Sequence, residues 1–185
     1  MAVHMCLSRP LSTLLLCLLT ATAALASTAD SHAASATCSG ARSSIAKVSP
    51  RAIGGAVLCL VNAERRARGL APLRDAGPLR TAAQRFSADM VARGYFDHVS
   101  PHGSTVSSRV RGAGYRNMSS VGENIGWGSG AMATPAAIVR AWMASPPHRA
   151  VILNGHFREA GVGVTAGAPV AGRTGATFVL DVGSR

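Results

Sequence analysis

The sequence predicts an α+β domain, and two observations support this prediction. Between Pro50 and Gly94, apolar residues recur every three or four positions, which is the period of amphipathic helices. Near the C-terminus, residues 157–165 and 176–182 alternate or run apolar, as strands do. Short helical segments and one extended segment, 121–127, lie between, so helices come first and strands close the chain. A composition of 48% hydrophobic and 15% charged residues fits one compact domain.

The two long helices have recognisable ends. Ser49 reads as the N-cap of the first helix and Pro50 as its first residue, and Gly69 closes it. Asp75 is predicted to open the second helix, which Gly94 ends. One face of this second helix is apolar and the other charged, so we interpret the apolar face as core. The apolar positions are Leu79, Ala82, Ala83, Phe86, Met90 and Val91.

The middle of the chain predicts loops and short elements. Residues 95–103 read as a loop and residues 105–113 as a short helix. Residues 121–127 are rich in β-formers and bracketed by glycine, so we expect an internal strand or extended segment. Thr134 and Pro135 repeat the combination of a cap followed by proline, which predicts another helix start.

The last third of the chain predicts a short helix and a hairpin. Pro146 and Pro147 break the preceding helix and can start a short one that runs through Ile152. A turn rich in glycine and proline joins the apolar segments 157–165 and 176–182, which are therefore predicted to pair as a β-hairpin. No internal repeat and no second domain are visible in the sequence.

The first 26 residues read as a signal peptide. Arg9 precedes an apolar run over residues 11–19, and Ala24-Leu25-Ala26 has the small-x-small pattern of a cleavage site. The run is shorter than the roughly 20 residues that span a bilayer, so a membrane anchor is disfavoured. We therefore expect a secreted, extracellular protein that is cleaved near Ser27 or, as the alternative, near Ala34.

Cleavage there divides the chain into three parts and settles the use of cysteine. Residues 1–26 are the signal peptide, residues 27–49 a loosely held arm rich in Ala, Ser and Thr, and residues 50–185 the domain. Cys38 and Cys59 remain after cleavage, and two cysteines in an exported protein most simply form one disulfide. The alternative is a buried free thiol at Cys59.

The chain is strongly basic, with 19 Lys and Arg residues against 8 Asp and Glu residues. Only Lys47 is a lysine, and so much arginine beside abundant alanine and glycine fits the codon bias of a GC-rich genome. The alternative is a surface that binds anions, such as a membrane surface or an anionic cell-wall polymer. The arginines are not interleaved with aromatic residues, so nucleic acid is a disfavoured partner.

Three fragments hold the candidate site. Gly122-Glu123-Asn124-Ile125-Gly126-Trp127-Gly128 places a lone carboxylate among glycines. Tyr95-Phe96-Asp97-His98 and Trp142-Met143-Ala144-Ser145-Pro146-Pro147-His148 each place a histidine in a turn near aromatic residues. Histidine together with a carboxylate is the usual material of a metal site or an acid/base site.

At these fragments the sequence resembles the CAP superfamily of SCP/PR-1-like domains, in its secreted bacterial form. The resemblance covers residues 60–164. It implies a three-layer α-β-α sandwich whose central cavity is lined by two histidines and two acids. Position by position, His98 matches the first histidine, Glu123 the first acid and His148 the second histidine.

The second acid of the family does not carry over to this chain. Ser145 stands about where animal and plant members have it. Glu159 could supply a carboxylate from elsewhere, although we interpret it as a surface strand residue. Asn124 and Trp127 are expected to hold the Glu123 loop in place. The resemblance thus implies a ligand cleft formed by His98, Glu123, Asn124, Ser145 and His148.

The resemblance implies a binding module, expected to be monomeric, whose cleft holds a small or lipid-like ligand. A divalent metal such as zinc could assist, held by His98, His148 and Glu123. One alternative is a basic wall-associated interaction protein, and another is a metal-dependent hydrolase that uses the same three residues. An enzyme is disfavoured because the chain has no G-x-S-x-G motif and the second acid is unmatched. The alternative for both histidines is a structural role, in which a ring N–H donates a hydrogen bond to a backbone carbonyl in a turn.

Overall fold

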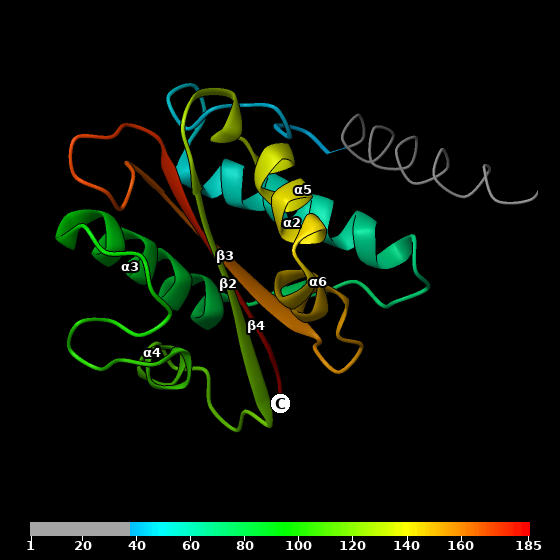
Figure 1. Cartoon of the computed structure of the whole chain (residues 1–185). Coiled ribbons are helices and arrows are strands. Elements are labelled where there is room, and N and C mark those ends of the chain that lie inside the picture. The colour runs from blue at the N-terminus through cyan, green and yellow to red at the C-terminus, as the bar shows by residue number, and fades with distance from the viewer. Residues whose placement is uncertain (1–37) are drawn as a thin grey trace, which may run out of the picture.

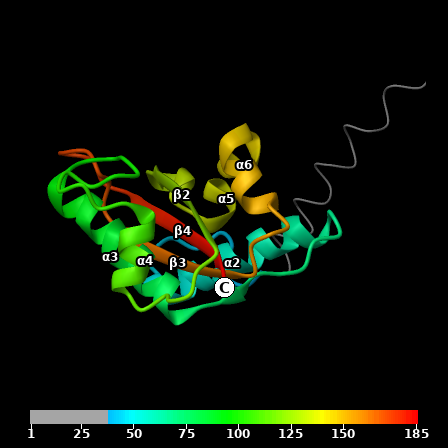
Figure 2. The ribbon, with the colours of Figure 1, turned by 90° about the horizontal axis from the view of Figure 1, so that it is seen from below.

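The structure is a computed structural model, and it describes residues 38–185. The predicted signal peptide and residues 27–37 of the predicted arm lie outside the described residues. Cys38 forms a disulfide with Cys59, with 5.8 Å between their Cα atoms, so the segment that leads into the domain is tied to the first helix. The domain is a three-layer α+β sandwich, as predicted, with a sheet between two layers of helices (Figures 1 and 2).

The middle layer is a four-stranded mixed sheet. Its strand order is β1-β3-β4-β2, in which β1 pairs parallel with β3 and the other neighbours pair antiparallel. β3 and β4 form the predicted hairpin. The predicted extended segment is β2, which lies at one edge of the sheet and faces the viewer in Figure 1. The strands are β1 (Arg74–Asp75), β2 (Ser120–Gly128), β3 (Glu159–Ala166) and β4 (Ala176–Ser184).

Helices cover both faces of this sheet (Figure 2). One layer is α2 (Pro50–Arg66), α5 (Pro135–Ala144) and α6 (Pro146–Leu153), and a 3-10 turn, η1 (Gly130–Met132), leads into α5. The other layer is α3 (Gly77–Arg93) and α4 (Val106–Gly112). The main core lies between α2, α5, α6 and the sheet, and smaller clusters lie under α3 and α4.

Most helix ends follow the predicted capping signals, but α2 ends at Arg66 with Ala67 as its C-cap, before the predicted Gly69. The Ser49 side chain accepts a hydrogen bond at the start of α2, and Gly94 ends α3 in the left-handed conformation, with φ of 67°. Asp75, however, does not open α3, because Ala76 is the N-cap and Asp75 belongs to β1. Its carboxylate instead pairs with Arg51 and Arg80, so its contacts join α2 to α3.

Two glycines let α3 lie directly on the sheet. A Cβ atom at Gly161 would overlap the backbone of Leu79 and Arg80, and a Cβ atom at Gly163 would overlap the backbone of Ala83. The loop that follows α3 reaches β2, where His98 meets Glu123. This loop holds the first candidate histidine.

Candidate functional site

The first half of the site is a pair formed by His98 and Glu123. Glu123 lies on β2, and Ile125, two residues on, packs with Phe86 of α3, so Glu123 points to the α3 side of the sheet. His98 lies in the loop after α3, and its Nδ1 is 2.7 Å from Glu123 Oε1. The Glu123 side chain is 3% exposed and the His98 side chain 54%. The site therefore has a buried carboxylate with an imidazole ring above it that reaches solvent.

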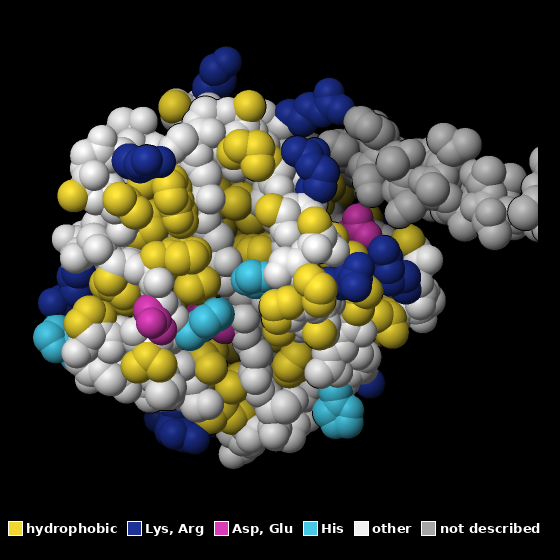
Figure 3. All heavy atoms as spheres, viewed as in Figure 1, with side chains coloured by type: hydrophobic (Ala, Val, Ile, Leu, Met, Phe, Trp, Pro, Cys, Tyr) yellow, Lys and Arg dark blue, Asp and Glu magenta, His cyan; other side chains and the backbone are white. Residues whose placement is uncertain are grey.

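Glu123 favours the charged form of this ring. The hydrogen bond from His98 to Glu123 is the largest cause that raises the pKa of His98, and burial partly opposes it. Figure 3, viewed as Figure 1, shows histidine and acidic side chains beside one another near the middle of this face. Hydrophobic side chains lie on either side of them.

Arg109 of α4 holds this pair in place. Its guanidinium donates to Glu123 Oε2 at 2.6 Å, to the carbonyl of Ser104 at 2.7 Å and to the carbonyl of His98 at 3.1 Å. The same group stacks on the Phe86 ring, 3.4 Å from its centroid. Arg109 therefore offsets the charge of Glu123 and fixes the loop that carries His98.

Asp181 is a second acid of the site that sequence reasoning missed. It lies directly opposite Glu123 in the β2–β4 register and is completely buried. Neither of its carboxylate oxygens is met by a hydrogen-bond donor from residues 38–185. Burial raises the pKa of Asp181 well above its usual range, and the charge of Glu123 raises it further. The sequence carries one signal of it, a lone acid inside the apolar run 178–182.

His148 completes the group of candidate residues from the other face of the sheet. It lies on α6, and its Nδ1 is 2.7 Å from Ser145 Oγ. Asn124 Nδ2 donates to the backbone carbonyl of His148 at 3.0 Å. Adjacent residues of a strand face opposite sides, so Asn124 reaches α6 while Glu123 reaches the loop after α3. Ser145 and Asn124 thus position His148, and among the described residues no hydrogen bond joins Asn124 to the Glu123 side chain.

The two imidazoles differ in their affinity for a proton. Burial lowers the pKa of His148, and the nearby His98 lowers it further. Since the pKa of His98 is raised, there is a pH range in which His98 is charged and His148 is neutral. The rings are near enough to influence each other, although no hydrogen bond joins His148 to His98 or Glu123 within the described range.

Glu159 is not the surface strand residue that we predicted. It is 8% exposed, and its oxygens accept hydrogen bonds from Tyr115 at 2.7 Å and from Arg185 at 2.8 Å. Tyr115 is itself completely buried in the cluster under α4, and this explains why the acid is buried as well. The Glu159 carboxylate is therefore committed to structural contacts and does not supply the missing acid.

The three predicted metal ligands do not form a common ligand set. Both oxygens of Glu123 are engaged, one by His98 and the other by Arg109. Within residues 38–185, no group of three or more His, Cys, Asp or Glu side chains could hold a metal ion. The side chains present do not fit a three-ligand zinc site, so we derive no metal chemistry from them.

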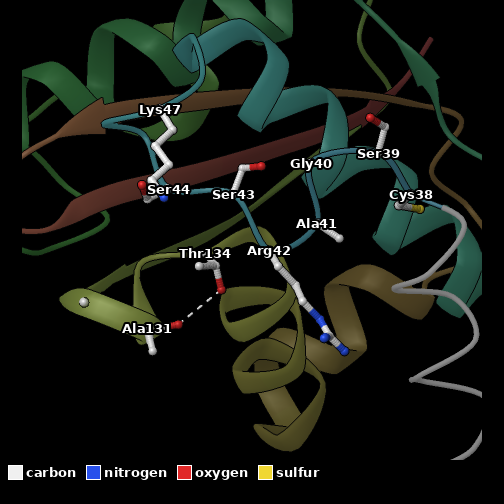
Figure 4. Close-up of a pocket in the computed structure, with 11 residues that line it drawn as sticks. Cys38, Ser39, Gly40, Ala41, Arg42, Ser43, Ser44, Lys47, Ala131 and Thr134 are labelled. Carbon is white, nitrogen blue, oxygen red and sulfur yellow. Dashed lines mark hydrogen bonds between the residues drawn. The ribbon is translucent and has the colours of Figure 1, made fainter.

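A large hollow of the surface lies elsewhere. It has a volume of about 800 Å³ and lies between residues 38–47 and the segment from η1 to Thr134 (Figure 4). None of the candidate site residues lines it.

Among the described helices, none is long and apolar enough to cross a membrane.

The chain matches the family described as CAP, the cysteine-rich secretory protein family, over residues 58–179. It is 40% identical over 107 residues to the uncharacterized protein YkwD of Bacillus subtilis. This alignment covers 58% of this chain and 40% of YkwD. It is 35% identical over 108 residues to the uncharacterized membrane protein YlbC of the same species, which covers 58% of this chain and 30% of YlbC. The chain thus spans less than half the length of these curated relatives.

Two solved structures share the fold. One is an extracellular protein containing an SCP domain from Bacillus anthracis, with a TM-score of 0.60 and 23% identity, over 75% of this chain and 44% of that chain. The other is an outer surface protein from Borrelia burgdorferi, with a TM-score of 0.60 and 18% identity, over 70% of this chain and 90% of that chain. The family match and the shared fold agree, and this chain belongs to the CAP (cysteine-rich secretory protein) family.

Proposed function

We propose that this protein is a secreted binding module whose cleft holds a small amphipathic anion. The observation that carries the proposal is the contact between the exposed His98 ring and the buried Glu123 carboxylate, whose charge is offset by Arg109. Arg109 offsets the charge of Glu123, and the raised pKa of Asp181 favours the neutral form of that acid. A protonated His98 therefore adds one positive charge to this group, beside the exposed carboxylate of Asp97, and its Nε2–H has no hydrogen-bond partner among the described residues. A carboxylate or phosphate head group fits such a donor.

The apolar part of the ligand would lie against the loop that carries His98. Phe96 is 43% exposed and Val99 is 46% exposed, and they lie on either side of His98 in the sequence. Two large apolar side chains exposed beside a charged ring form a small amphipathic surface. An acyl chain with an anionic head would cover both residues while its head group meets the imidazole.

The test compares a ligand that has both an acyl chain and an anionic head with two ligands that each have only one of these parts. Laurate has both the chain and the charged head, dodecyl maltoside has the chain with a neutral head, and acetate has the head alone. We expect laurate to bind best at pH 6 and to bind more weakly as the pH rises through the pKa of His98. His98→Ala should weaken laurate binding at least tenfold, which corresponds to about 1.4 kcal/mol.

The matched control is His102→Ala, which removes an exposed histidine from the same loop and should leave calorimetric binding of laurate unchanged. Equal binding of laurate by His98→Ala and the unaltered protein would contradict the proposal. Equal affinity for laurate and dodecyl maltoside would contradict the role of the charged head. We do not propose the metal-dependent hydrolase, because its three residues do not fit a shared metal position.

Secretion is the second part of the proposal. It is supported by the predicted cleavage pattern, and both solved relatives are described as extracellular or outer surface proteins. Mass spectrometry of the protein recovered outside the cells should give a mature N-terminus near Ser27 or Ala34. An intact Met1 on the exported protein would contradict a cleaved signal peptide.

A further inference from the structure

The edge of the sheet opposite the candidate site carries a second surface feature. β1 covers only the first two residues of β3, Glu159 and Ala160. Further along this edge, the Gln84 side chain replaces a strand, because it donates to the carbonyl of Val164 and accepts from its N–H, both at 3.0 Å. At Val164 this side chain occupies the backbone groups that a further strand would need, so it hinders the addition of a strand at this part of the edge. We therefore consider partners that bind beside it through their side chains.

α2 and α3 flank β3 on opposite faces of the sheet (Figure 2). Two hollows are lined by residues of these three elements. The larger has a volume of about 490 Å³ and the smaller about 110 Å³. Val162, Arg51 and Arg80 line both hollows, so we treat the two as one groove, the β3-edge groove. Its apolar residues are the exposed Pro50 at one end, the half-buried Leu58 at the other end, and Val162, which is 6% exposed, in the floor.

The charge of this groove is mostly positive. Arg51 comes from α2, and Arg80 and Arg85 come from α3. Asp75 is the one acid that lines it, and it pairs with Arg51 at 3.3 Å and with Arg80. The Arg51 side chain is 63% exposed in this pair, so solvent screens the attraction and the contact is weak. Arg85 forms no ion pair with the described residues, which leaves Arg51 and Arg85 able to meet an added anion from opposite walls.

We propose that the β3-edge groove binds an acidic peptide segment that also carries apolar side chains. Carboxylates of the peptide would pair with Arg51 and Arg85, and an apolar side chain would cover Val162 between Pro50 and Leu58. Arginine suits this role because its planar guanidinium pairs with a carboxylate through two hydrogen bonds. A polymer of phosphates and polyols would meet the arginines but would leave the apolar floor uncovered, so we favour a peptide.

The probe is an acetylated and amidated peptide of sequence Glu-Leu-Glu-Leu-Glu, titrated into the whole secreted protein by calorimetry. We expect it to bind, with an affinity that falls as salt rises, because exposed charges carry much of the attraction. A Gln-Leu-Gln-Leu-Gln peptide should lose the charge contacts, and a Glu-Ser-Glu-Ser-Glu peptide the apolar contact. Each of them should bind at least tenfold more weakly. Equal binding of all three peptides would overturn the proposal.

Two changes on the protein test the location of binding. The double variant Arg51→Glu/Arg85→Glu reverses both charges and should weaken binding of the Glu-Leu peptide at least tenfold. Arg140→Glu on α5 alters an exposed arginine that does not line the groove, and it should change binding less than twofold. If the Arg140 variant loses as much affinity as the double variant, binding reflects net charge and not this groove.

A third variant blocks the groove without changing its charge. Gly55 lies on the wall formed by α2, and a Cβ atom there meets nothing within 4 Å. Gly55→Leu adds a side chain to the hollow and also improves the intrinsic helix propensity of α2, so folding should not suffer. We expect it to weaken peptide binding at least tenfold, and unchanged binding would contradict the groove. His98→Ala should leave peptide binding unchanged, because the two sites lie at opposite edges of the sheet.

Discussion

At the scale of single residues, the site is a row of ionisable side chains from β2, β4, α4 and the loop after α3. Arg109 and the protonated form of His98 flank Glu123, and Asp181 lies against it from the next strand. Two ionised carboxylates would repel each other in this buried position, and the raised pKa of Asp181 therefore favours the state in which Glu123 alone is charged. When Asp181 is neutral, the charge of Arg109 has to offset only the charge of Glu123.

The neutrality of Asp181 gives a prediction about stability. Its pKa is raised in the folded state, so the folded protein binds a proton that the unfolded chain releases above the ordinary pKa of Asp, about 3.9. The native state is therefore penalised as pH rises from about 4 to the raised pKa, by about 1.4 kcal/mol for each unit. Asp181→Asn removes the titration and should be more stable than the unaltered protein at pH 8, with little difference below pH 4.

Urea unfolding at pH 4 and pH 8 measures this effect. Glu64→Gln is the control, since it removes an acid from a surface ion pair on α2 and should change stability by less than about 1 kcal/mol at either pH. A gain of equal size at both pH values for Asp181→Asn would show that Asp181 does not titrate between them.

His98, Glu123 and Asp181 also show what sequence could and could not predict at this scale. The pairing of His98 with Glu123 could be expected, because both residues belong to motifs that the family resemblance aligns. Asp181 could not, because its position depends on the register of β2 against β4, which join residues far apart in the chain. Burial and charge at such positions are set by strand pairing and not by local pattern.

At the scale of elements, helix ends were easier to predict than short strands. The capping residues of α2, α4 and α5 act within three residues of themselves, so local sequence is sufficient. β1 has only two residues, and it exists because it pairs with β3, so no local signal could distinguish it from a helix start at Asp75. Because β1 pairs with β3, the carboxylate of Asp75 lies between Arg51 of α2 and Arg80 of α3.

The close packing of α3 on β3 gives the second prediction. Gly161→Ala places a methyl group where the backbone of Leu79 and Arg80 lies, so the helix must move away from the sheet. We expect a loss of about 3 kcal/mol or more in the free energy of unfolding, the upper range for overpacking. Gly55→Ala in α2 is the matched control, because its methyl group meets nothing within 4 Å. That variant should gain about 0.5–1 kcal/mol from helix propensity. Similar denaturation midpoints for the two variants would contradict this account of the packing.

At the scale of the whole molecule, the sheet separates two surfaces of different chemistry. The β2 side carries His98, Glu123 and Asp181, and the β3 edge carries the arginine-lined groove. The basic composition visible in the sequence therefore has a local counterpart at the β3 edge. The sequence could not place it there, because the arginines come from α2 and α3 and meet only across the sheet.

The disulfide gives a prediction for the stability of the whole domain. Cys38 and Cys59 are 21 residues apart, and closing a loop of that length stabilises the folded state by about 3 kcal/mol on the chain-entropy model. For a domain of this size that corresponds to about 6–12 °C in the midpoint of thermal unfolding. We expect reductant to lower the midpoint of the unaltered protein by this amount. The double variant Cys38→Ser/Cys59→Ser should start at the lower midpoint, and reductant should not change it further.

Because the bond ties the leading segment to α2 and not to α3 or α4, laurate binding at His98 should survive reduction at 25 °C. A reduced protein, verified by its mass, that keeps the original midpoint would show that the leading segment adds nothing to the cooperative unit.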